Sequence, residues 1–159
     1  MTWAWAKTVQ AIACIPRLKE TGSLDRGALV CASATLLTNW ERELERFAPS
    51  LSISTYYGAS RRSKAANVTL TSYETFLRDQ KKLEDREWDV AVLDEAHLIK
   101  NPDAKRSKAL KSVTASRRLA LSGTPVENHL GEFWSIFDFA LPGYLRTLDR
   151  FARDYRRRQ

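Results

Sequence analysis

The chain has 159 residues, of which 43% are hydrophobic and 28% are charged, as is typical of one soluble globular domain with a core. No stretch approaches the roughly 20 apolar residues of a membrane-spanning helix, and the N-terminus lacks the basic start and long apolar core of a signal peptide. These properties exclude a membrane protein and favour a cytoplasmic one, nucleoid-associated in a bacterium or nuclear in a eukaryote. The net charge of +7 fits a polyanionic partner such as nucleic acid and a plain basic surface equally well.

Apolar runs alternate along the chain with amphipathic helical patterns, which predicts βαβ units, an α/β fold and a mostly parallel sheet flanked by helices. Strands are expected at 27–32, 51–56, 68–71, 88–93 and 118–121. Helices are expected at 7–20, 73–83, 103–113, 129–140 and 147–157. A further helix, closed by Pro49, is indicated by one apolar face: Leu36, Leu37, Trp40, Leu44 and Phe47.

Both cysteines, Cys14 and Cys31, lie in apolar segments, and we expect reduced thiols in the core, as in a cytosolic protein. In the first helix, Val9, Ile12 and Ala13 are expected to face inward. The two cysteines and two histidines do not have the spacing of a metal site.

Two adjacent carboxylates, Asp94 and Glu95, directly follow the apolar strand 88–93. In open α/β sheets, ligands bind at the C-terminal ends of the strands. A carboxylate there can hold Mg²⁺, and its neighbour can orient the water that attacks a γ-phosphate. The alternative is a helix cap with two solvated acids.

A second apolar run, 118–121, ends in a turn rich in hydroxyl groups that contains Ser122 and Thr124. Parallel strands deliver their C-terminal ends to one edge of the sheet, so this turn is expected near the two carboxylates. The pair of strand ends favours a nucleotide-driven motor over a helix cap.

These segments together resemble the SWI/SNF-type DNA-dependent ATPases of helicase superfamily two. Residues 94–101 resemble their DEAH-box motif II, and 121–128 resemble motif III, a pattern that continues through 132–139. Residues within 37–49 resemble the helix after motif Ia, and 70–73 resemble motif Ib. The match covers essentially the whole chain and is similar to the first RecA-like lobe alone.

The resemblance divides the chain into two parts. Residues 1–145 correspond to a RecA-like ATP-binding lobe that is truncated at its N-terminus. Residues 146–159 form a basic helical tail that leads toward a second lobe absent from this sequence, which in the family carries an arginine finger.

The resemblance also implies ATP and Mg²⁺ as cofactors. Asp94 would bind Mg²⁺, and Glu95 would activate the attacking water. Lys7 would contact the β- and γ-phosphates, and Thr8 would ligate Mg²⁺.

The implied partner is double-stranded DNA. His97, Ser122 and Thr124 would couple the nucleotide state to the DNA-facing surface. Thr35 and Ser72 would contact the phosphate backbone, and such contacts position DNA without specifying sequence.

The phosphate loop departs from the family pattern Asp-Asp-Met-Gly-Leu-Gly-Lys-Thr, because Ala4 and Ala6 replace both glycines. A Cβ is unfavourable where the backbone needs a positive φ or must approach phosphate closely. The strand that should precede this loop is also missing from the sequence. A shifted reading frame over codons 1–7, restored by one additional A nucleotide, would convert a gene segment for the family loop into the N-terminal residues of this chain. The nucleotide sequence of the gene tests this hypothesis.

Three functions remain to be weighed. The first is the ATP-hydrolysing lobe of a DNA translocase, inactive as an isolated fragment. The second is a non-catalytic remnant of such a motor that binds DNA or protein. The third, a P-loop metabolic kinase, is disfavoured because motif III and the helix around Trp40 have no role there. We expect Trp40, Phe133, Trp134 and Phe137 to pack in the core rather than stack on bases.

Overall fold

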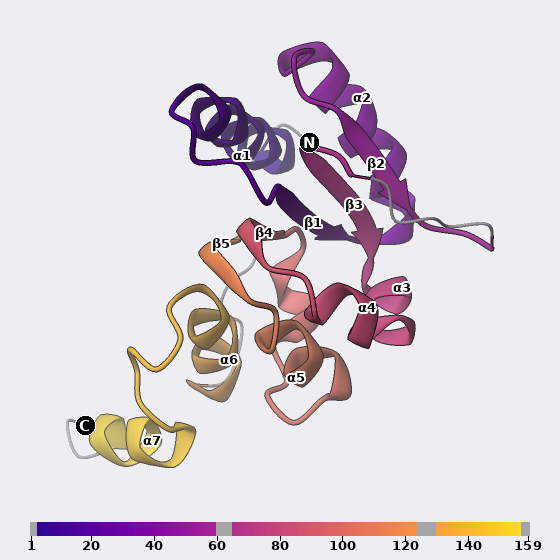
Figure 1. Cartoon of the computed structure of the whole chain (residues 1–159). Helices are drawn as coiled ribbons and strands as arrows, with labels where there is room; N and C mark the ends of the chain where they lie inside the picture. Colours follow the sequence, from indigo (N-terminus) through magenta and orange to yellow (C-terminus); the bar gives the residue numbers. More distant parts are fainter. Residues whose placement is uncertain (1–2, 60–64, 124–129, 157–159) are drawn as a thin grey trace.

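The computed structural model describes residues 3–59, 65–123 and 130–156. A single parallel sheet lies at the centre and helices cover both of its faces (Figure 1). The strands are β1 (Ala28–Ala32), β2 (Ile53–Tyr56), β3 (Val68–Ser72), β4 (Trp88–Leu93) and β5 (Ala115–Ala120). Their order across the sheet is β2-β3-β1-β4-β5, and all four neighbouring pairs are parallel. The predicted α/β class is therefore confirmed.

Two helices, α1 (Trp3–Glu20) and α2 (Leu37–Phe47), cover one face of the sheet (Figure 1). Alternate residues of β1 point to this face, and Val30 packs there beneath Ile12 of α1 and Trp40 of α2. Successive side chains of a strand point to opposite faces, so a strand covered on both sides is apolar throughout. All five residues of β1 are accordingly buried.

In the part of the chain that the structure describes, four further helices cover the other face of the sheet. They are α3 (Tyr73–Arg78), α4 (Gln80–Glu84), α5 (Lys105–Lys111) and α6 (Leu130–Ala140), with the short helix η2 (Ala96–Ile99) between β4 and α5. Leu29 and Cys31 of β1 point to this side, where Phe76 and Phe139 complete the core. The last helix, α7 (Leu148–Arg156), packs on α6 away from the sheet (Figure 1).

Several predicted boundaries differ from the structure: α1 begins at Trp3 rather than 7, and β2 begins at Ile53 rather than 51. The helix expected at 73–83 is divided at Asp79, whose backbone leaves the helical region (φ −108°, ψ 27°) and whose carboxylate accepts a hydrogen bond from Tyr56. Strand β5 begins at Ala115 rather than 118, because Ala115 pairs with Trp88 of β4. The first residues of β5 include Ser116, Arg117 and Arg118, so the sequence shows no apolar run there.

Several positions expected in the core are not buried. Phe133, Trp134 and Phe137 are only half-buried, whereas Trp40 is fully buried as expected. Cys14 is exposed and Ala13 faces solvent, because the inward stripe of α1 runs through Ala11, Ile12 and Ile15. Cys14 lies two residues after Ile12, which on a helix places it nearly opposite. Phe47, at the last position of α2, is 47% exposed.

Strand β5 pairs only with β4 among the described residues, and no strand precedes α1 there. None of the described helices is long and apolar enough to cross a membrane.

Candidate functional site

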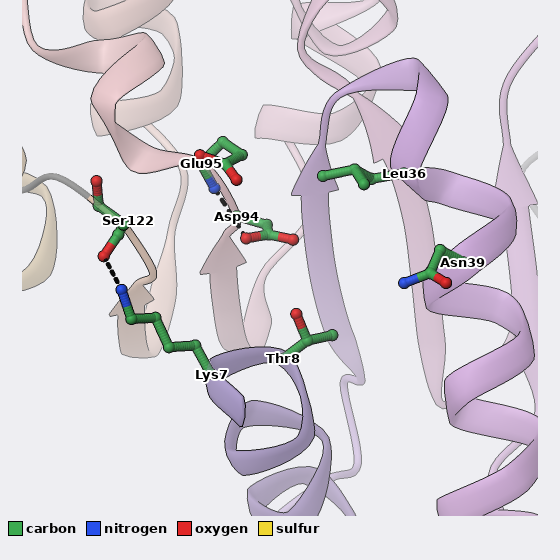
Figure 2. Close-up of a pocket in the computed structure, with 8 residues that line it drawn as sticks. Lys7, Thr8, Leu36, Asn39, Asp94, Glu95 and Ser122 are labelled. Atoms are coloured by element: carbon green, nitrogen blue, oxygen red, sulfur yellow. Dashed lines mark hydrogen bonds between the residues drawn. The ribbon is translucent and has the colours of Figure 1, made fainter. Parts of the chain in front are cut away.

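A cleft of about 280 Å³ lies at the C-terminal ends of β4 and β5, beside the start of α1 and the first turn of α2 (Figure 2). It is lined by Lys7, Thr8, Leu36, Asn39, Asp94, Glu95, Ser122 and Gly123. Five of the residues singled out from the sequence, from three separate segments, therefore meet at one place.

Asp94 is held by hydrogen bonds on its backbone and its side chain. Its amide donates to the carbonyl of Cys31 at 2.9 Å, and its own carbonyl accepts from the Tyr73 hydroxyl at 2.7 Å. The carboxylate accepts on both oxygens, from the Glu95 amide at 2.9 Å and from the Trp40 indole Nε1 at 2.7 Å. The side chain of Asp94 is thus fixed in direction at the mouth of the cleft.

Burial keeps the Tyr73 hydroxyl protonated and able to donate. It raises the pKa of Tyr73 well above its usual value, and the nearby Cys31 and Asp94 add to the increase. The Tyr73 hydroxyl therefore stays protonated, and able to donate to the Asp94 carbonyl, to a higher pH than the hydroxyl of an exposed tyrosine.

Glu95 occupies the left-handed region (φ 54°, ψ 49°), which non-glycine residues adopt rarely. This conformation turns the chain sharply from β4 into η2. The next amide, that of Ala96, donates to the carbonyl of Leu121 at 2.8 Å and joins the two strand ends. Nδ1 of His97 lies 3.0 Å from Oε2 of Glu95, a close contact that is not aligned as a hydrogen bond. Backbone strain of this kind often accompanies functional sites.

Ser122 follows β5 and faces Lys7 across the cleft. The Lys7 ammonium donates to the Ser122 carbonyl (Figure 2). The Ser122 hydroxyl is buried and has no hydrogen-bond partner among the described residues. A buried hydroxyl without a partner costs free energy, so it is suited to receive a polar group of a ligand. Thr124 lies outside the described residues.

Lys7 and Thr8 lie within α1, which begins at Trp3. Residues 3–6, where the family has a glycine-rich loop, are helical here. The amides of Lys7 and Thr8 therefore sit inside the helix rather than at its open N-terminus, where free N–H groups bind anions. Their side chains line the cleft, and Thr8 is 7% exposed.

The two residues proposed for DNA differ in exposure. Thr35 lies in the short helix η1 (Ala34–Leu36), is exposed, and shares a hydrogen bond with Ser33. Ser72 is fully buried, and its hydroxyl accepts from the Thr75 amide at 3.1 Å as the N-cap of α3. In this conformation Ser72 holds the start of α3 and does not face solvent.

The cleft suits a metal ion that keeps part of its water. No cluster of three acidic, histidine or cysteine side chains occurs in the part of the chain that the structure describes. Asp94 and Glu95 offer carboxylates, and Thr8 offers a hydroxyl, all on one cleft. Mg²⁺ is commonly bound by one or two carboxylates together with water and phosphate oxygens, so these donors fit it.

Sequence reasoning missed four residues of the site: Leu36, Asn39, Trp40 and Tyr73. It assigned Leu36 and Trp40 to an apolar helix face and gave Asn39 and Tyr73 no role beyond a matching motif. The indole N–H of a buried tryptophan needs a hydrogen-bond acceptor, and this was the one feature of the sequence that could have indicated a polar partner for Trp40. Nothing local in the sequence identifies Asp94 as that acceptor.

Comparison with known proteins shows the family to which the chain belongs. A family model described as the SNF2-related domain matches residues 4–158. The YwqA protein of Bacillus subtilis, named as an ATP-dependent helicase/translocase, is 42% identical over 158 residues, which is 94% of this chain and 17% of that protein. The TATA-binding protein-associated factor mot1 of Schizosaccharomyces pombe is 42% identical over 135 residues, 80% of this chain and 7% of its own.

A solved structure is also similar. The Sulfolobus solfataricus SWI2/SNF2 ATPase core in complex with dsDNA superimposes with a TM-score of 0.87 at 37% identity, over 95% of this chain and 32% of that chain. This chain thus spans a minor part of each relative. It belongs to the SNF2-related family and is homologous to the first RecA-like lobe of the SWI2/SNF2 ATPase core.

Proposed function

We propose that this chain is the ATP- and Mg²⁺-binding lobe of a DNA translocase of the SNF2 type. The observation that carries the proposal is the convergence of Lys7, Thr8, Asp94, Glu95 and Ser122 on one cleft. These residues supply a cation, a hydroxyl, two carboxylates and a buried hydroxyl without a partner, a set that suits a metal-bound triphosphate.

Each residue has a role that follows from its place. Asp94 and Thr8 would hold Mg²⁺, which when bound neutralises charge on the phosphate oxygens. Glu95 would orient the attacking water and accept its proton. When nucleotide binds, the Lys7 ammonium would donate to a phosphate oxygen instead of the Ser122 carbonyl. This change would need movement of the lysine side chain only, not of the backbone.

Duplex DNA is the proposed partner of the exposed surface near η1. Support comes from the Sulfolobus neighbour, whose core is described in complex with dsDNA, and from the net charge of +7. Thr35, which is exposed, would contact a phosphate, while Ser72 would act by holding α3. His97, Ser122 and Thr124 would connect the nucleotide cleft to that surface. Contacts to the DNA backbone would make binding independent of sequence.

The proposed lobe comprises residues 1–145. Residues 146–159, which include α7, would form a basic tail that leads toward a second lobe. In related NTPases an arginine brought to the phosphates is worth about 10³–10⁵ in rate, so this lobe alone should hydrolyse ATP near the background rate.

The helical conformation of residues 3–6 favours weak nucleotide binding, because the amides that would cradle phosphates are not gathered in a loop. The second candidate function, a non-catalytic remnant that binds DNA or protein, rests on this observation. Isothermal titration of the chain with ATP and Mg²⁺ separates the two. Tight Mg²⁺-dependent binding would contradict the expectation of weak binding and, with it, the non-catalytic remnant.

The catalytic assignment is tested in a repaired protein. Ala4 and Ala6 are changed to glycine, and a strand preceding α1 and a second lobe are supplied from a relative. We expect DNA-stimulated ATP hydrolysis that Glu95→Gln lowers at least about 100-fold, the range for loss of a general base. Glu87→Gln is the matched control, since Glu87 pairs with Arg26 on the exposed surface. The motor interpretation fails if the repaired protein is inactive and Glu95→Gln has no effect.

A further inference from the structure

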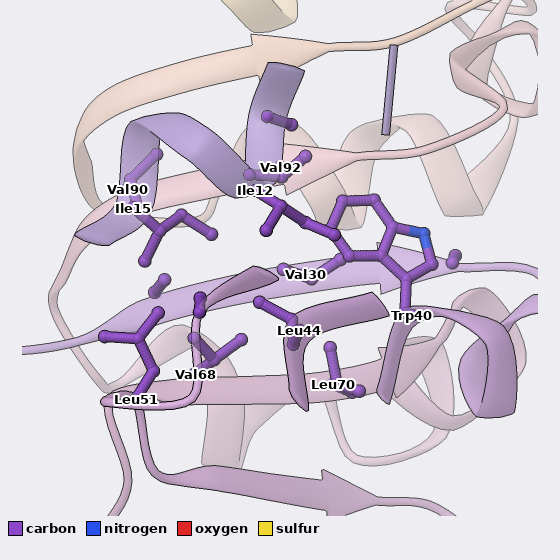
Figure 3. Close-up of a cluster of buried hydrophobic side chains, with 14 of the residues drawn as sticks. Ile12, Ile15, Val30, Trp40, Leu44, Leu51, Val68, Leu70, Val90 and Val92 are labelled. Atoms are coloured by element: carbon purple, nitrogen blue, oxygen red, sulfur yellow. The ribbon is translucent and has the colours of Figure 1, made fainter. Parts of the chain in front are cut away.

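Trp40 lies in the first turn of α2 with its side chain fully buried on the sheet (Figure 3). Its rings contact the apolar cluster that includes Val30, Leu70 and Val92. From within this cluster the indole Nε1 reaches the Asp94 carboxylate, 54 residues further along the chain, at 2.7 Å. One side chain therefore connects the core with the cleft.

The partner of this indole is not an ordinary one for a core tryptophan. Trp88 is equally buried, and its Nε1 donates to the backbone carbonyl of Leu83, five residues away, at 3.2 Å. Trp40 donates to a charged carboxylate over a shorter distance. Hydrogen bonds to ionised acceptors are shorter and roughly twice as strong as neutral ones.

The two donors to Asp94 constrain its carboxylate in full. Oδ1 accepts from the Glu95 amide, which the backbone fixes, and Oδ2 accepts from the Trp40 indole, which the core fixes. With both oxygens held, the carboxylate plane cannot rotate about its terminal torsion, which is otherwise broad. Each oxygen still has a lone pair for a metal ion or a metal-bound water.

We propose that Trp40 is a positioning residue for the metal site: its indole N–H orients the Asp94 carboxylate toward the cleft. The inference rests on the proposed function, because it assigns Trp40 a role in the Mg²⁺ site placed there. Hydrogen-bond partners of metal ligands commonly change metal affinity by about 10- to 100-fold when removed.

Through the same contact, the position of α2 affects the geometry of the proposed metal site. Trp40 cannot shift within the close-packed core unless its helix moves with it. The helix follows η1 directly, where Thr35 is exposed. A displacement of η1 and the first turn of α2 therefore changes the hydrogen bond to Asp94.

The test uses Mn²⁺, which prefers the same oxygen ligands as Mg²⁺ and broadens nearby NMR signals. Mn²⁺ is titrated into the ¹⁵N-labelled chain, and broadening of the Asn39 and Glu95 amides gives an apparent dissociation constant. Trp40→Phe keeps an aromatic ring and removes the N–H, and we expect Mn²⁺ to bind roughly 10-fold more weakly. Trp88→Phe is the matched control, since it makes the same change at a tryptophan that does not contact Asp94.

Asp94→Asn identifies the site, and we expect it to abolish the broadening and to shift the Trp40 indole signal. Equal Mn²⁺ binding by the wild-type chain and Trp40→Phe would overturn the inference and leave the proposed metal site intact. An equal loss in Trp88→Phe would also overturn it, because the effect would then be general loosening of the core. Absence of any Asp94-dependent broadening in the wild-type chain would refute the proposed site and the inference together.

Trp40→Phe creates a cavity, so a second variant protects the test against misfolding. Benzothienylalanine placed at position 40 keeps both rings and replaces the N–H with sulfur. It should preserve the fold and show the same roughly 10-fold weaker Mn²⁺ binding. Wild-type affinity in this variant would overturn the role of the N–H.

Discussion

Asp94 and Glu95 are neighbours in the chain, but their side chains are held by different parts of the molecule. Asp94 is fixed by Trp40 from α2 and by the adjacent amide, whereas Glu95 is turned by its left-handed backbone toward His97. Two adjacent carboxylates thus have separate environments, which is what distinct roles in metal binding and proton transfer require.

The two cysteines should differ sharply in reactivity. Cys14 is exposed on α1, while Cys31 is buried in β1 and burial raises the pKa of its thiol well above the usual range. The reactive species is the thiolate, so Cys31 is protected by both inaccessibility and protonation. We expect Ellman's reagent to modify one thiol quickly in the native chain and the second only after unfolding. Cys14→Ser should remove the fast phase, and a fast phase that persists in this variant would contradict the assignment.

Strand β4 is followed by Asp94, the carboxylate proposed to bind metal, and has a structural carboxylate near its start. Asp89 is 6% exposed and accepts from the amides of Arg26 and Gly27 at 2.7 and 3.2 Å. Gly27 has a positive φ of 88°, and a Cβ there would lie 3.0 Å from the Ala66 carbonyl oxygen. The Asp89 carboxylate thereby stabilises the tight turn that leads into β1.

Asp89→Ala should destabilise the chain by about 3 kcal/mol, because two amides beside the sheet lose a charged acceptor. Urea denaturation measures this change. Glu87→Ala serves as the control, since Glu87 also pairs with Arg26 but is largely exposed, and its loss should have a much smaller effect. Similar losses in both variants would show that the ion pair on Arg26, rather than the buried amides, carries the stability.

At the scale of the whole molecule, the sheet is covered on both faces, and this places ionisable groups in the core. Burial raises the pKa of Cys31 and of Tyr73, so the folded chain keeps protons that the unfolded chain releases. The associated stability is present below the unfolded pKa values, about 8.5 for cysteine and about 10 for tyrosine, and is lost as pH rises through the folded values.

The urea midpoint should therefore fall as the pH rises above about 8.5, and fall more steeply above about 10. Cys31→Ala should remove most of the decline between these two values while leaving the steeper part. An unchanged profile in Cys31→Ala would assign the decline to groups other than this thiol.

The strands, most helices and the carboxylate pair could be predicted from the sequence, because each is recorded in a local pattern. Buried strands of a parallel sheet appear as apolar runs, and amphipathic helices appear as a period of 3.6 residues. The division of 73–83 at Asp79 could not be predicted, since its cause includes the hydroxyl of Tyr56 on strand β2. The early start of β5 likewise depends on pairing with β4.

The sequence by itself determined the α/β class, the family and the two strand ends that carry Asp94 and Ser122. Only the tertiary structure decided which residues surround these strand ends. It placed the Trp40 indole on Asp94 and Lys7 against Ser122, buried Ser72 beneath α3, and continued α1 through residues 3–6. The physical reason is sequence separation: local patterns record burial and period, whereas a hydrogen bond between residues 54 or 115 apart exists only once the sheet has brought them together.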